Sequence, residues 1–462
     1  MPDDAEFMSG WDDPTIVTER LRQSLESMGV TTFPIISSTV EPLGGHSGLS
    51  GEMSLLTLTV RSADDDESKT DTLKFVLKRT LPAQEAKLHS KTLGLYREGT
   101  FYSTIGPWIQ ERLDKVPCKC ASSRDNSNDS QPSNKISFIP KALFAASDAE
   151  TSQKAIVLEY YQNSTEAGMF FPHSIHNAFR KCDTGNASPA INEKSISLEA
   201  TRIAASIHGT FYRDRTLLEN PEISSKLRVA DWLRGLNKES FLASQQEVCD
   251  TWARSKEQWE KGEFYDGKVA MEPKFIDVMD ASCKLALDFD AFVKKWNVDG
   301  EDDVGAKKIG WSLVHSDYHP GNLLCVDANN KDSNATPQLV LLDWEVVGVG
   351  SGPQDIGQFL ISHMKTQDAV DMLDELSSVY RKSLIETLQS VNPSQVNSVP
   401  CVEDIKNEIV YGGLERWVWL NAYMSGWAGR MPPVYMQYFH DQMHGWIEKN
   451  GIAPGGVGMP RP

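Results

Sequence analysis

Three residues in the second half of the chain have the types and the spacing that phosphoryl transfer requires. Asp317 lies in the run His-Ser-Asp-Tyr-His-Pro-Gly-Asn at residues 315–322, Asn322 closes that run, and Asp343 follows the apolar stretch 339–342. A carboxylate such as Asp317 can accept the proton of a substrate hydroxyl. The oxygens of Asn322 and Asp343 are suitable ligands for magnesium held against phosphate groups. The pattern therefore predicts phosphoryl transfer, with Asp317 as the base and Asn322 and Asp343 as metal ligands.

Each of these residues has a simpler explanation when it is taken alone. An isolated aspartate is often a turn or cap residue, because its side chain hydrogen-bonds nearby backbone groups. His315 could act as the base instead of Asp317, although we favour a structural role in which it hydrogen-bonds the loop backbone. Asp355 is interpreted as a helix cap or as an anchor for backbone amides of this loop. The combination of three suitable groups on one predicted hairpin, residues 315–345, is what favours the functional interpretation.

A site for nucleotide phosphates also needs a cation, and Lys78 near the end of a predicted strand is our candidate. Glu98 follows on a helix predicted over residues 83–105, and a carboxylate there can hold the lysine in place. Lys74 shares a strand face with Lys78 and is its rival, whereas Glu85 is a weaker rival of Glu98. An exposed surface lysine is the alternative to any such role.

A glycine-rich segment precedes the first long predicted strand. Residues 43–51 are Leu-Gly-Gly-His-Ser-Gly-Leu-Ser-Gly, and four glycines in this segment let backbone N–H groups approach phosphates closely. The segment is neither a strict GxGxxG nor a P-loop, and a flexible turn is the alternative. We predict that Gly45, Ser47 and Gly48 contact the nucleotide phosphates.

The elements that must position these residues form a β-rich part followed by a helical part. Strands are predicted over 53–60, 72–79, 136–146 and 154–161, and helical patterns over 196–212, 228–296 and 354–449. The predicted fold class is α+β, with a small antiparallel β-lobe and a larger, mainly helical lobe. The expected domains are an N-terminal helical extension (1–30), an N-lobe (31–161) with a disordered insertion (121–135), a C-lobe (162–450) that holds the hairpin 315–345 and the acceptor site, and a loose tail (451–462).

Length and composition are those of a soluble globular protein. The 462 residues exceed the usual size of a single core, and 40% are hydrophobic and 24% charged. No apolar run approaches the roughly 20 residues that cross a bilayer. The acidic N-terminus also lacks the apolar segment of a secretory signal. We therefore expect a cytoplasmic protein without a membrane partner.

Charge and cysteine usage exclude two further classes. A net charge of −18 disfavours nucleic acid as a partner, because binding to its backbone needs a basic surface. Among the seven cysteines only Cys118 and Cys120 are close in sequence, and no second pair completes a zinc site with them. Free thiols in a reducing compartment are the expected state. Oligomeric state is not predicted.

Together these motifs resemble the aminoglycoside phosphotransferase and choline-kinase-like superfamily, and within it the ecdysteroid-kinase-like (CHK kinase-like) branch. The resemblance spans about residues 40–430, and the hairpin is its most specific part. It implies a protein-kinase-like fold, ATP as the donor, Mg²⁺, and a small-molecule hydroxyl as the acceptor. It also implies that adenine packs near Leu158, Glu159 and Tyr160. The residues that carry the resemblance are the glycine-rich segment 44–51, Arg97-Glu98 with Phe101-Tyr102, the run 315–322, Leu-Asp-Trp-Glu at 342–345 and Asp-Ile-Gly at 355–357.

Two other functional classes stay open on the sequence. The chain could be a pseudokinase, a nucleotide-binding scaffold that keeps the fold without turnover. It could also phosphorylate protein, although the sequence lacks an Asp-Phe-Gly and an Ala-Pro-Glu motif. Steroid, choline-like, sugar and antibiotic acceptors all stay open. The aromatic residues Trp417, Trp419, Tyr423 and Trp427 could line an acceptor pocket, but we favour a packed helix face.

Overall fold

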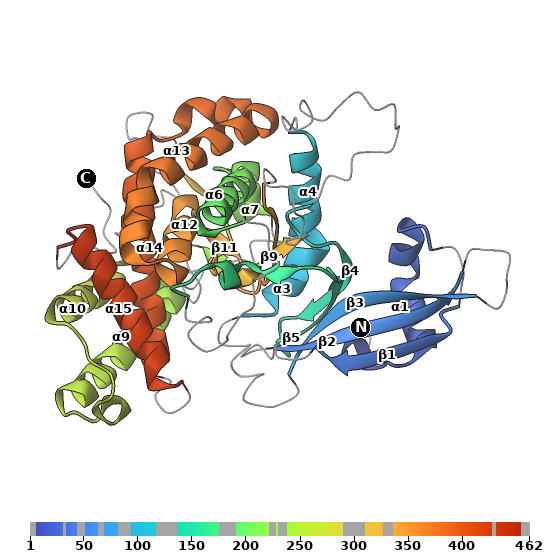
Figure 1. Ribbon diagram of the computed structural model, residues 1–462, viewed down its shortest axis with the longest axis horizontal. Coiled ribbons are helices and arrows are strands. Elements are labelled where there is room, and N and C mark those ends of the chain that lie inside the picture. Colours follow the sequence, from blue (N-terminus) through green and yellow to red (C-terminus); the bar gives the residue numbers. More distant parts are fainter. Residues whose placement is uncertain are drawn as a thin grey trace. The chain divides into compact units, whose positions relative to one another are not determined.

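A computed structural model of the protein is shown in Figure 1. The chain divides into two compact units that are described separately. Unit 1 comprises Met1–Glu111, Lys135–Gln162 and Val340–Val347, and unit 2 comprises Arg112–Asn134, Asn163–Leu339 and Gly348–Pro462. The structure describes residues 6–30, 34–43, 51–62, 69–81, 94–116, 137–174, 191–220, 228–229, 238–289, 310–326, 336–426 and 431–453.

Unit 1 is built on one antiparallel sheet of five strands in the order β1-β2-β3-β5-β4. Side chains of β2 alternate between buried and partly buried from Ser54 to Val60, which is the pattern of a strand with one face on a core. The sheet face packs on Leu21 and Leu25 of an N-terminal helix, α1. The elements are η1 (Glu6–Met8), α1 (Pro14–Ser27), β1 (Ser37–Pro42), β2 (Gly51–Arg61), β3 (Thr70–Thr80), β4 (Ala142–Asp148) and β5 (Gln153–Glu159).

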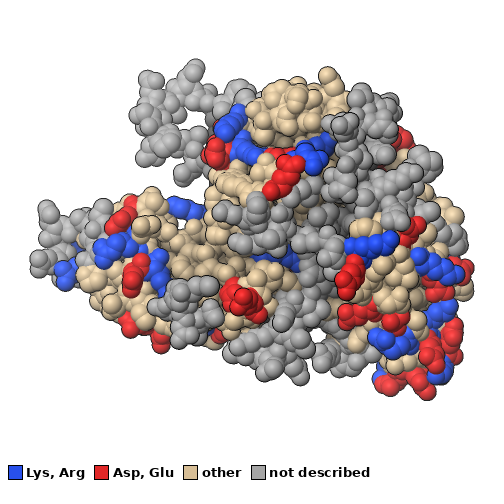
Figure 2. All heavy atoms as spheres, turned by 180° about the vertical axis from the view of Figure 1, so that it is seen from behind, with Lys and Arg blue, Asp and Glu red and all other residues tan. Residues whose placement is uncertain are grey.

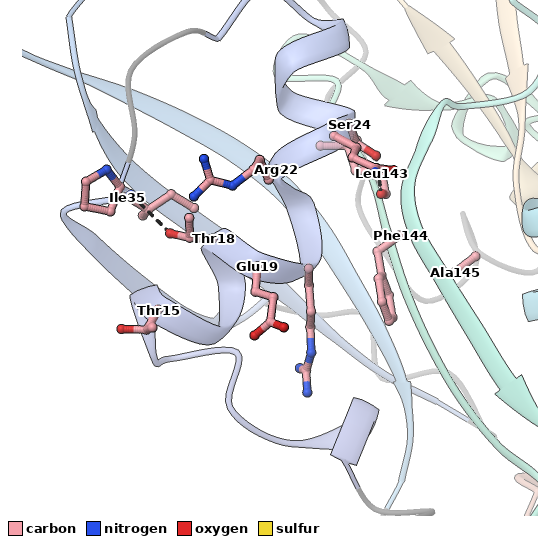
Figure 3. A pocket seen from close by; sticks show the side chains of 12 residues that line it. Thr15, Thr18, Glu19, Arg22, Ser24, Ile35, Leu143, Phe144 and Ala145 are labelled. Atoms are coloured by element: carbon pink, nitrogen blue, oxygen red, sulfur yellow. Dashed lines mark hydrogen bonds between the residues drawn. The ribbon is translucent and has the colours of Figure 1, made fainter. Parts of the chain in front are cut away.

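Helix α1 is attached to the sheet by specific hydrogen bonds as well as by its apolar face. Ser24 donates its hydroxyl to the carbonyl of Leu143 at 2.6 Å, and the amide of Ile35 donates to Thr18 Oγ1 at 3.2 Å. Figure 3 shows these side chains around a cavity of about 900 Å³ between α1 and β4. None of the predicted site residues lines this cavity, so it is not a candidate for the predicted chemistry.

A second helical segment of unit 1 begins with α3 (Arg97–Thr100), passes through the π-helical turn η2 (Phe101–Ile105) and continues as α4 (Gly106–Asp114), whose last three residues are counted in unit 2. Gly99 lets this segment lie directly on β4, because a Cβ there would come within 2.5 Å of Ser147 Cβ. Arg97 is buried and donates to the carbonyls of Gly94 at 2.8 Å and Val347 at 3.2 Å. Because Arg97 and Gly99 flank Glu98, these contacts hold the Glu98 backbone in place against the sheet.

Unit 2 is mainly helical. Its elements include two small sheets, in which β11 pairs antiparallel with β8 and parallel with β7, and β6 pairs antiparallel with β9. The long helices are α6 (Glu193–Thr210), α9 (Lys238–Glu260), α10 (Pro273–Ala286), α12 (Gly352–His363), α13 (Thr366–Val391), α14 (Val402–Ser425) and α15 (Pro433–Lys449). The short elements are β6 (Thr165–Glu166), η4 (Ala167–Phe170), α7 (Thr216–Glu219), β7 (Arg228–Val229), η5 (Phe264–Gly267), β8 (Trp311–Val314), η6 (Pro320–Asn322), β9 (Leu323–Val326), β10 (Gln338–Leu341), β11 (Gly348–Ser351) and η7 (Pro393–Ser398).

The crossing of α12 and α14 is unusually close and fixes the centre of unit 2. A Cβ on Gly357 would lie 2.1 Å from the carbonyl oxygen of Ile409, and one on Gly413 would lie 2.5 Å from Gly357 Cα. Two glycines therefore allow the helix backbones to touch, as small residues do wherever helices approach closely. This crossing brings polar side chains of both helices to the loop that follows β8.

The predicted α+β class, with a small antiparallel β part and a larger, mainly helical part, is confirmed. The prediction of helix throughout 228–296 is wrong at its start, because Arg228 and Val229 pair with β11 and obtain their backbone hydrogen bonds there.

Figure 2 shows acidic and basic side chains intermixed over α9 and η5, where Lys261 pairs with Glu257 at 2.6 Å. No helix among the described residues is long and apolar enough to span a membrane.

Candidate active site

A buried cluster of charges in unit 1 is centred on Lys78. Its Nζ lies 2.6 Å from Asp343 Oδ1, 2.8 Å from Glu98 Oε2 and 3.6 Å from Glu345 Oε2. The structure thus joins three residues that are far apart in sequence and were predicted to act together, namely Lys78, Glu98 and Asp343. The rival Lys74 is exposed on the same strand, and Glu85 lies outside the described residues.

A second lysine, Lys154 on β5, completes the cluster and was not predicted. Its side chain is 1% exposed and its Nζ contacts Glu98 Oε2 and, at 3.0 Å, Glu345 Oε2. Glu98 therefore lies between two ammonium groups, one from β3 and one from β5. The strand register explains this, since Lys78 is paired with Ile156 and Lys154 donates its backbone amide to Thr80 Oγ1 at 3.0 Å. Both lysines consequently point from the same face of the sheet.

Asp343 reaches the cluster through a strained turn. Its φ is 62°, a left-handed conformation that is uncommon for a residue other than glycine and costs of order 1–3 kcal/mol. The next residue, Trp344, is fully buried and stacks on Phe101 with ring centroids 3.9 Å apart and an interplanar angle of 9°. Packing of Trp344 under the helix thus holds the turn that presents Asp343 to Lys78.

The electrostatics of the cluster follow from its excess of carboxylates. Burial would lower the pKa of Lys78, but the three surrounding carboxylates raise it well above its usual value. Burial and the charge of Glu345 raise the pKa of Asp343 to about 7, while Lys78 opposes this. Because the Asp343 side chain is 32% exposed, solvent weakens these influences. Three acids and two lysines leave the site with one unbalanced negative charge when all are ionised, which is suited to a cation.

A second polar centre, in unit 2, surrounds Asp317. Asn322 donates its Nδ2 to Asp317 Oδ2 at 3.2 Å and to the Asp317 carbonyl at 2.9 Å. Gln358, on α12, donates its Nε2 to Asp317 Oδ1 at 3.1 Å. His319 Nε2 lies 3.6 Å from Asp317 Oδ2. Each carboxylate oxygen is thus held by an amide, and the Asn322 oxygen is the atom of that side chain that can still face a cation.

The loop that carries Asp317 is held in place from two helices. Asp355 accepts the backbone amides of His315 at 2.8 Å and Ser316 at 3.1 Å. Arg416, on α14, donates its Nε to the Ser316 carbonyl at 2.8 Å. Ser316 has φ 62°, so these contacts stabilise another left-handed residue. Of the two interpretations of Asp355, the contacts support the anchor for backbone amides of the loop.

Two histidines hydrogen-bond groups that hold the Asp317 loop in place. His315 Nδ1 accepts the amide of Asp317 at 3.2 Å, which confirms the structural contact that we favoured for it. His208 is buried between Asp355 Oδ2 at 3.2 Å and the Tyr380 hydroxyl at 2.9 Å, as expected for a structural histidine.

Asp317 is ionised in this environment. Burial alone would raise its pKa, but His319 and Arg416 hold the pKa well below its usual range. A carboxylate of such low basicity accepts a hydrogen bond readily but takes a full proton reluctantly. The arrangement is therefore suited to orienting a hydroxyl group.

The other residues predicted to contact the nucleotide are not joined to either polar centre by the contacts described above. Gly45, Ser47 and Gly48 lie outside the described residues. Glu159, at the end of β5, accepts the backbone amide of Lys141 at 3.1 Å and the Tyr161 hydroxyl at 3.0 Å.

The remaining predictions concern Tyr160, which was expected near the adenine, and the aromatic residues around α14. Tyr160 directly follows β5 and is partly buried. Trp417 and Trp419 are buried, and Trp419 stacks on Tyr423 at 5.3 Å, which favours helix packing over a pocket. Trp427 is outside the described residues.

Comparison with known proteins agrees with the predicted family. The model of the ecdysteroid kinase-like family matches residues 244–393, which include the loop at 315–322 and Asp343. No curated protein matches the chain. The resemblance to this kinase-like family is therefore found over the segment that carries Asp317, Asn322 and Asp343.

Solved structures of small-molecule kinases are similar to the chain at low identity. Choline kinase from Cryptosporidium parvum Iowa II has 11% identity over 96% of this chain and 98% of that chain, with a TM-score of 0.45. Ethanolamine kinase from Plasmodium vivax has 10% identity over 94% and 89%, with a TM-score of 0.39. Choline kinase LicA from Streptococcus pneumoniae has 10% identity over 94% and 99%, with a TM-score of 0.38. At these values the function has to be argued from the residues themselves.

Proposed function

We propose that this chain is a cytoplasmic phosphotransferase that moves the γ-phosphate of ATP, with Mg²⁺, to a hydroxyl group of a small molecule. The observation that carries the proposal is the buried Lys78–Glu98–Asp343 cluster, because phosphoryl transfer needs a restrained cation next to a metal-binding carboxylate. The ionised Asp317, held by Asn322 and Gln358, supports it as the group that receives the acceptor hydroxyl. The kinase-like family match is consistent with both.

The carboxylate oxygens of the cluster in unit 1 are suitable ligands for magnesium. Among the described residues, Glu98, Asp343 and Glu345 are the group whose ligand atoms lie within 4.8 Å of one another, and all are carboxylate oxygens. Magnesium prefers such oxygens to nitrogen or sulfur. Asp343 gives Oδ1 to Lys78 and has a second oxygen for a metal. When bound, Mg²⁺ would neutralise charge on the nucleotide phosphates.

We propose the following roles for the protein groups. Glu98 fixes the Lys78 ammonium, which is proposed to contact the nucleotide phosphates. Asp343 and Asn322 are the proposed metal ligands, and Gly45, Ser47 and Gly48 are proposed to give backbone contacts to phosphate. Glu159 and Tyr160 are proposed to pack near the adenine.

Asp317 is the proposed base, and its low pKa defines how it acts. It would accept the hydrogen bond of the acceptor hydroxyl and orient an oxygen lone pair towards phosphorus. The proton would move to the carboxylate late, as the bond to phosphorus forms and the hydroxyl becomes more acidic. Removal of Asp317 should therefore affect turnover more than nucleotide affinity.

The experiment that tests the proposal is ADP release from ATP with and without Mg²⁺ across a panel of hydroxyl compounds that covers steroids, amino alcohols, sugars and aminoglycosides. Asp317→Ala is run in parallel with every compound. Acceptor-dependent release that the variant lacks would establish the activity and its acceptor class. No release above the variant, combined with measurable ATP binding, would favour the alternative, a pseudokinase. Phosphate incorporated into polypeptide would instead indicate a protein kinase, and absence of ATP binding would contradict the proposed nucleotide site.

A further inference from the structure

Two cysteines meet between α9 and α10, in a part of unit 2 that the proposed reaction does not use. The sulfur of Cys249 on α9 lies 3.3 Å from the backbone carbonyl oxygen of Cys283 on α10. Both side chains are free thiols and both are partly exposed. They are 34 positions apart in sequence, so only the packing of the two helices brings them together.

The pair lines a cavity of about 340 Å³ together with Trp252, Lys256 and Asp280, which contact one another. Trp252 donates its Nε1 to Asp280 Oδ1 at 2.8 Å, and Lys256 Nζ contacts Asp280 Oδ2 at 2.6 Å. These contacts join α9 to α10 beside the thiols. A small reagent that enters the cavity therefore meets both cysteines, on two helices that are joined beside them.

We propose that Cys249 and Cys283 are a modification site at which a peroxide or a small disulfide forms a reversible disulfide between α9 and α10. With a peroxide, the Cys249 thiolate attacks one oxygen, the O–O bond breaks, and the departing oxygen takes up a proton, which leaves a sulfenic acid. The Cys283 thiol then attacks that sulfur and water leaves. With hydrogen peroxide, two thiols are oxidised and one H₂O₂ is reduced to two water molecules. With a small disulfide, the Cys249 thiolate attacks one of its sulfurs and one small thiol leaves; Cys283 then attacks the Cys249 sulfur and the second small thiol leaves.

The environment of the two thiols assigns their roles. A hydrogen bond from Cys283 lowers the pKa of Cys249 below its usual value, against the effect of burial. The same bond, together with burial, raises the pKa of Cys283. We therefore propose Cys249 as the thiolate that attacks first, because thiolates rather than thiols are the nucleophiles. Cys283 is the resolving thiol.

A metal site is the weaker explanation of the pair. Within the described part of the chain, the Glu98 cluster is the group of three or more His, Cys, Asp or Glu side chains that could hold an ion, and the two cysteines are not in it. A structural metal such as zinc generally needs four protein ligands. Two adjacent thiols without further ligands favour oxidation over metal binding.

The chain supplies matched controls for this site. Cys401 is exposed and contacts Asp404 Oδ2 at 2.9 Å, and within the described part of the chain no hydrogen bond joins it to another cysteine. Cys325 is buried, and burial raises its pKa to about 12. The reactivity of Cys401 thus shows how an exposed thiol without a partner thiol behaves. The reactivity of Cys325 shows how a buried thiol behaves.

The test uses the full chain, reduced and then treated with hydrogen peroxide or with oxidised glutathione. Peptides are mapped by mass spectrometry without reduction, for the wild type and for Cys249→Ser, Cys283→Ser and Cys401→Ser. We expect a peptide that contains residue 249 to be linked to one that contains residue 283 in the wild type and in Cys401→Ser. Dithiothreitol should remove the link, and either variant of the pair should lack it.

Two further readings complete the test. Cys283→Ser should accumulate sulfenic acid on Cys249, detected by a dimedone adduct, whereas Cys249→Ser should give little adduct on Cys283. The proposal is overturned if the wild-type pair is oxidised without a link between the two peptides, or if Cys401 reacts faster than Cys249. Protection of both thiols by added Zn²⁺, with a bound metal that persists through dialysis, would overturn it in favour of a metal site.

Discussion

Gln358 donates its side-chain amide to Asp317 Oδ1 at 3.1 Å, from the same helix that anchors the loop backbone through Asp355. One helix, α12, thus controls both the path of the loop and the direction of its carboxylate. Gln358 sits one residue after Gly357, where α12 touches α14, so its position is fixed by backbone contact. It is therefore placed to act as a positioning residue for the proposed base.

Gln358→Leu should lower kcat by roughly 10- to 100-fold, because a hydrogen bond to a charged group contributes about 1.5–3 kcal/mol. The KM for ATP should change little. Gln358→Glu should be more damaging, since a second carboxylate next to Asp317 repels it. Steady-state kinetics with an identified acceptor give both constants. Equal losses in kcat and in ATP affinity would show that Gln358 acts on the fold rather than on Asp317.

Lys154→Met should weaken ATP binding and lower the thermal unfolding midpoint. The substitution leaves Glu98 and Glu345 without one of their cations, and loss of one partner from a buried ion pair costs about 3–5 kcal/mol. Lys74→Met is the matched control, because Lys74 is exposed on β3 and should tolerate the change. Differential scanning calorimetry and ATP titration measure the two effects. A variant that matches wild type in both would remove Lys154 from the site.

Asp317→Ala and Asp343→Ala should separate turnover from metal binding. Asp317→Ala should reduce turnover by about 10²- to 10⁴-fold, the usual range for a lost acid–base group, with nucleotide affinity largely kept. Asp343→Ala should abolish the dependence of nucleotide affinity on Mg²⁺. Titration of ATP at several Mg²⁺ concentrations distinguishes the two variants. The ligand assignment is wrong if Asp343→Ala retains the wild-type Mg²⁺ dependence.

Gly357→Ala should destabilise the protein even though alanine favours helices. Its Cβ would lie 2.1 Å from the Ile409 carbonyl oxygen, which is backbone and cannot move without shifting α14. Overpacking of this kind costs about 1–3 kcal/mol. Gly445→Ala on α15 is the control, because the three atoms nearest to its Cβ all belong to the Thr366 side chain, whose hydroxyl can rotate away. Thermal unfolding should show a drop for the first variant and little change for the second.

His440 should make the protein less stable as pH falls. Burial against Phe275 lowers its pKa from 6.5 to about 4, so between these values the unfolded chain binds more protons than the folded one. The free energy of unfolding should therefore decrease from pH 6.5 to 4. His440→Phe should flatten this slope, whereas His444→Phe, at a side chain that is 30% exposed on the same helix, should keep it. Urea unfolding at several pH values measures the slope; the same slope in both variants would contradict the prediction.

The sequence was sufficient for groups whose role depends on local pattern. Strands predicted at 53–60 and 72–79 correspond to β2 and β3, because alternation reports which face is buried. Lys78 and Glu98 could be paired because a lysine and a carboxylate were expected on neighbouring elements. For Asp355 the sequence left a helix cap and an anchor for the loop amides as alternatives, and the structure was needed to decide between them.

Residues that act through long-range packing could not be found in this way. Lys154 has the pattern of an ordinary strand residue, and its role depends on the β3–β5 register that aligns it with Lys78. Gln358 and Arg416 reach the loop only because α12 and α14 cross at two glycines. The helix predicted to end at Ile105 continues through a π-helical turn to Asp114, which local periodicity does not reveal.

The contacts of Asp355 also have a consequence for the order in which the chain becomes functional. A chain synthesised only as far as residue 350 already contains Asp317, Asn322 and Asp343, but it lacks the carboxylate that receives the amides of His315 and Ser316. Gln358 and Arg416 come later still. The loop therefore takes its reactive shape only after the helices downstream of it have been made and docked. A truncated or nascent chain would hold every proposed reacting group without the contacts that shape their loop.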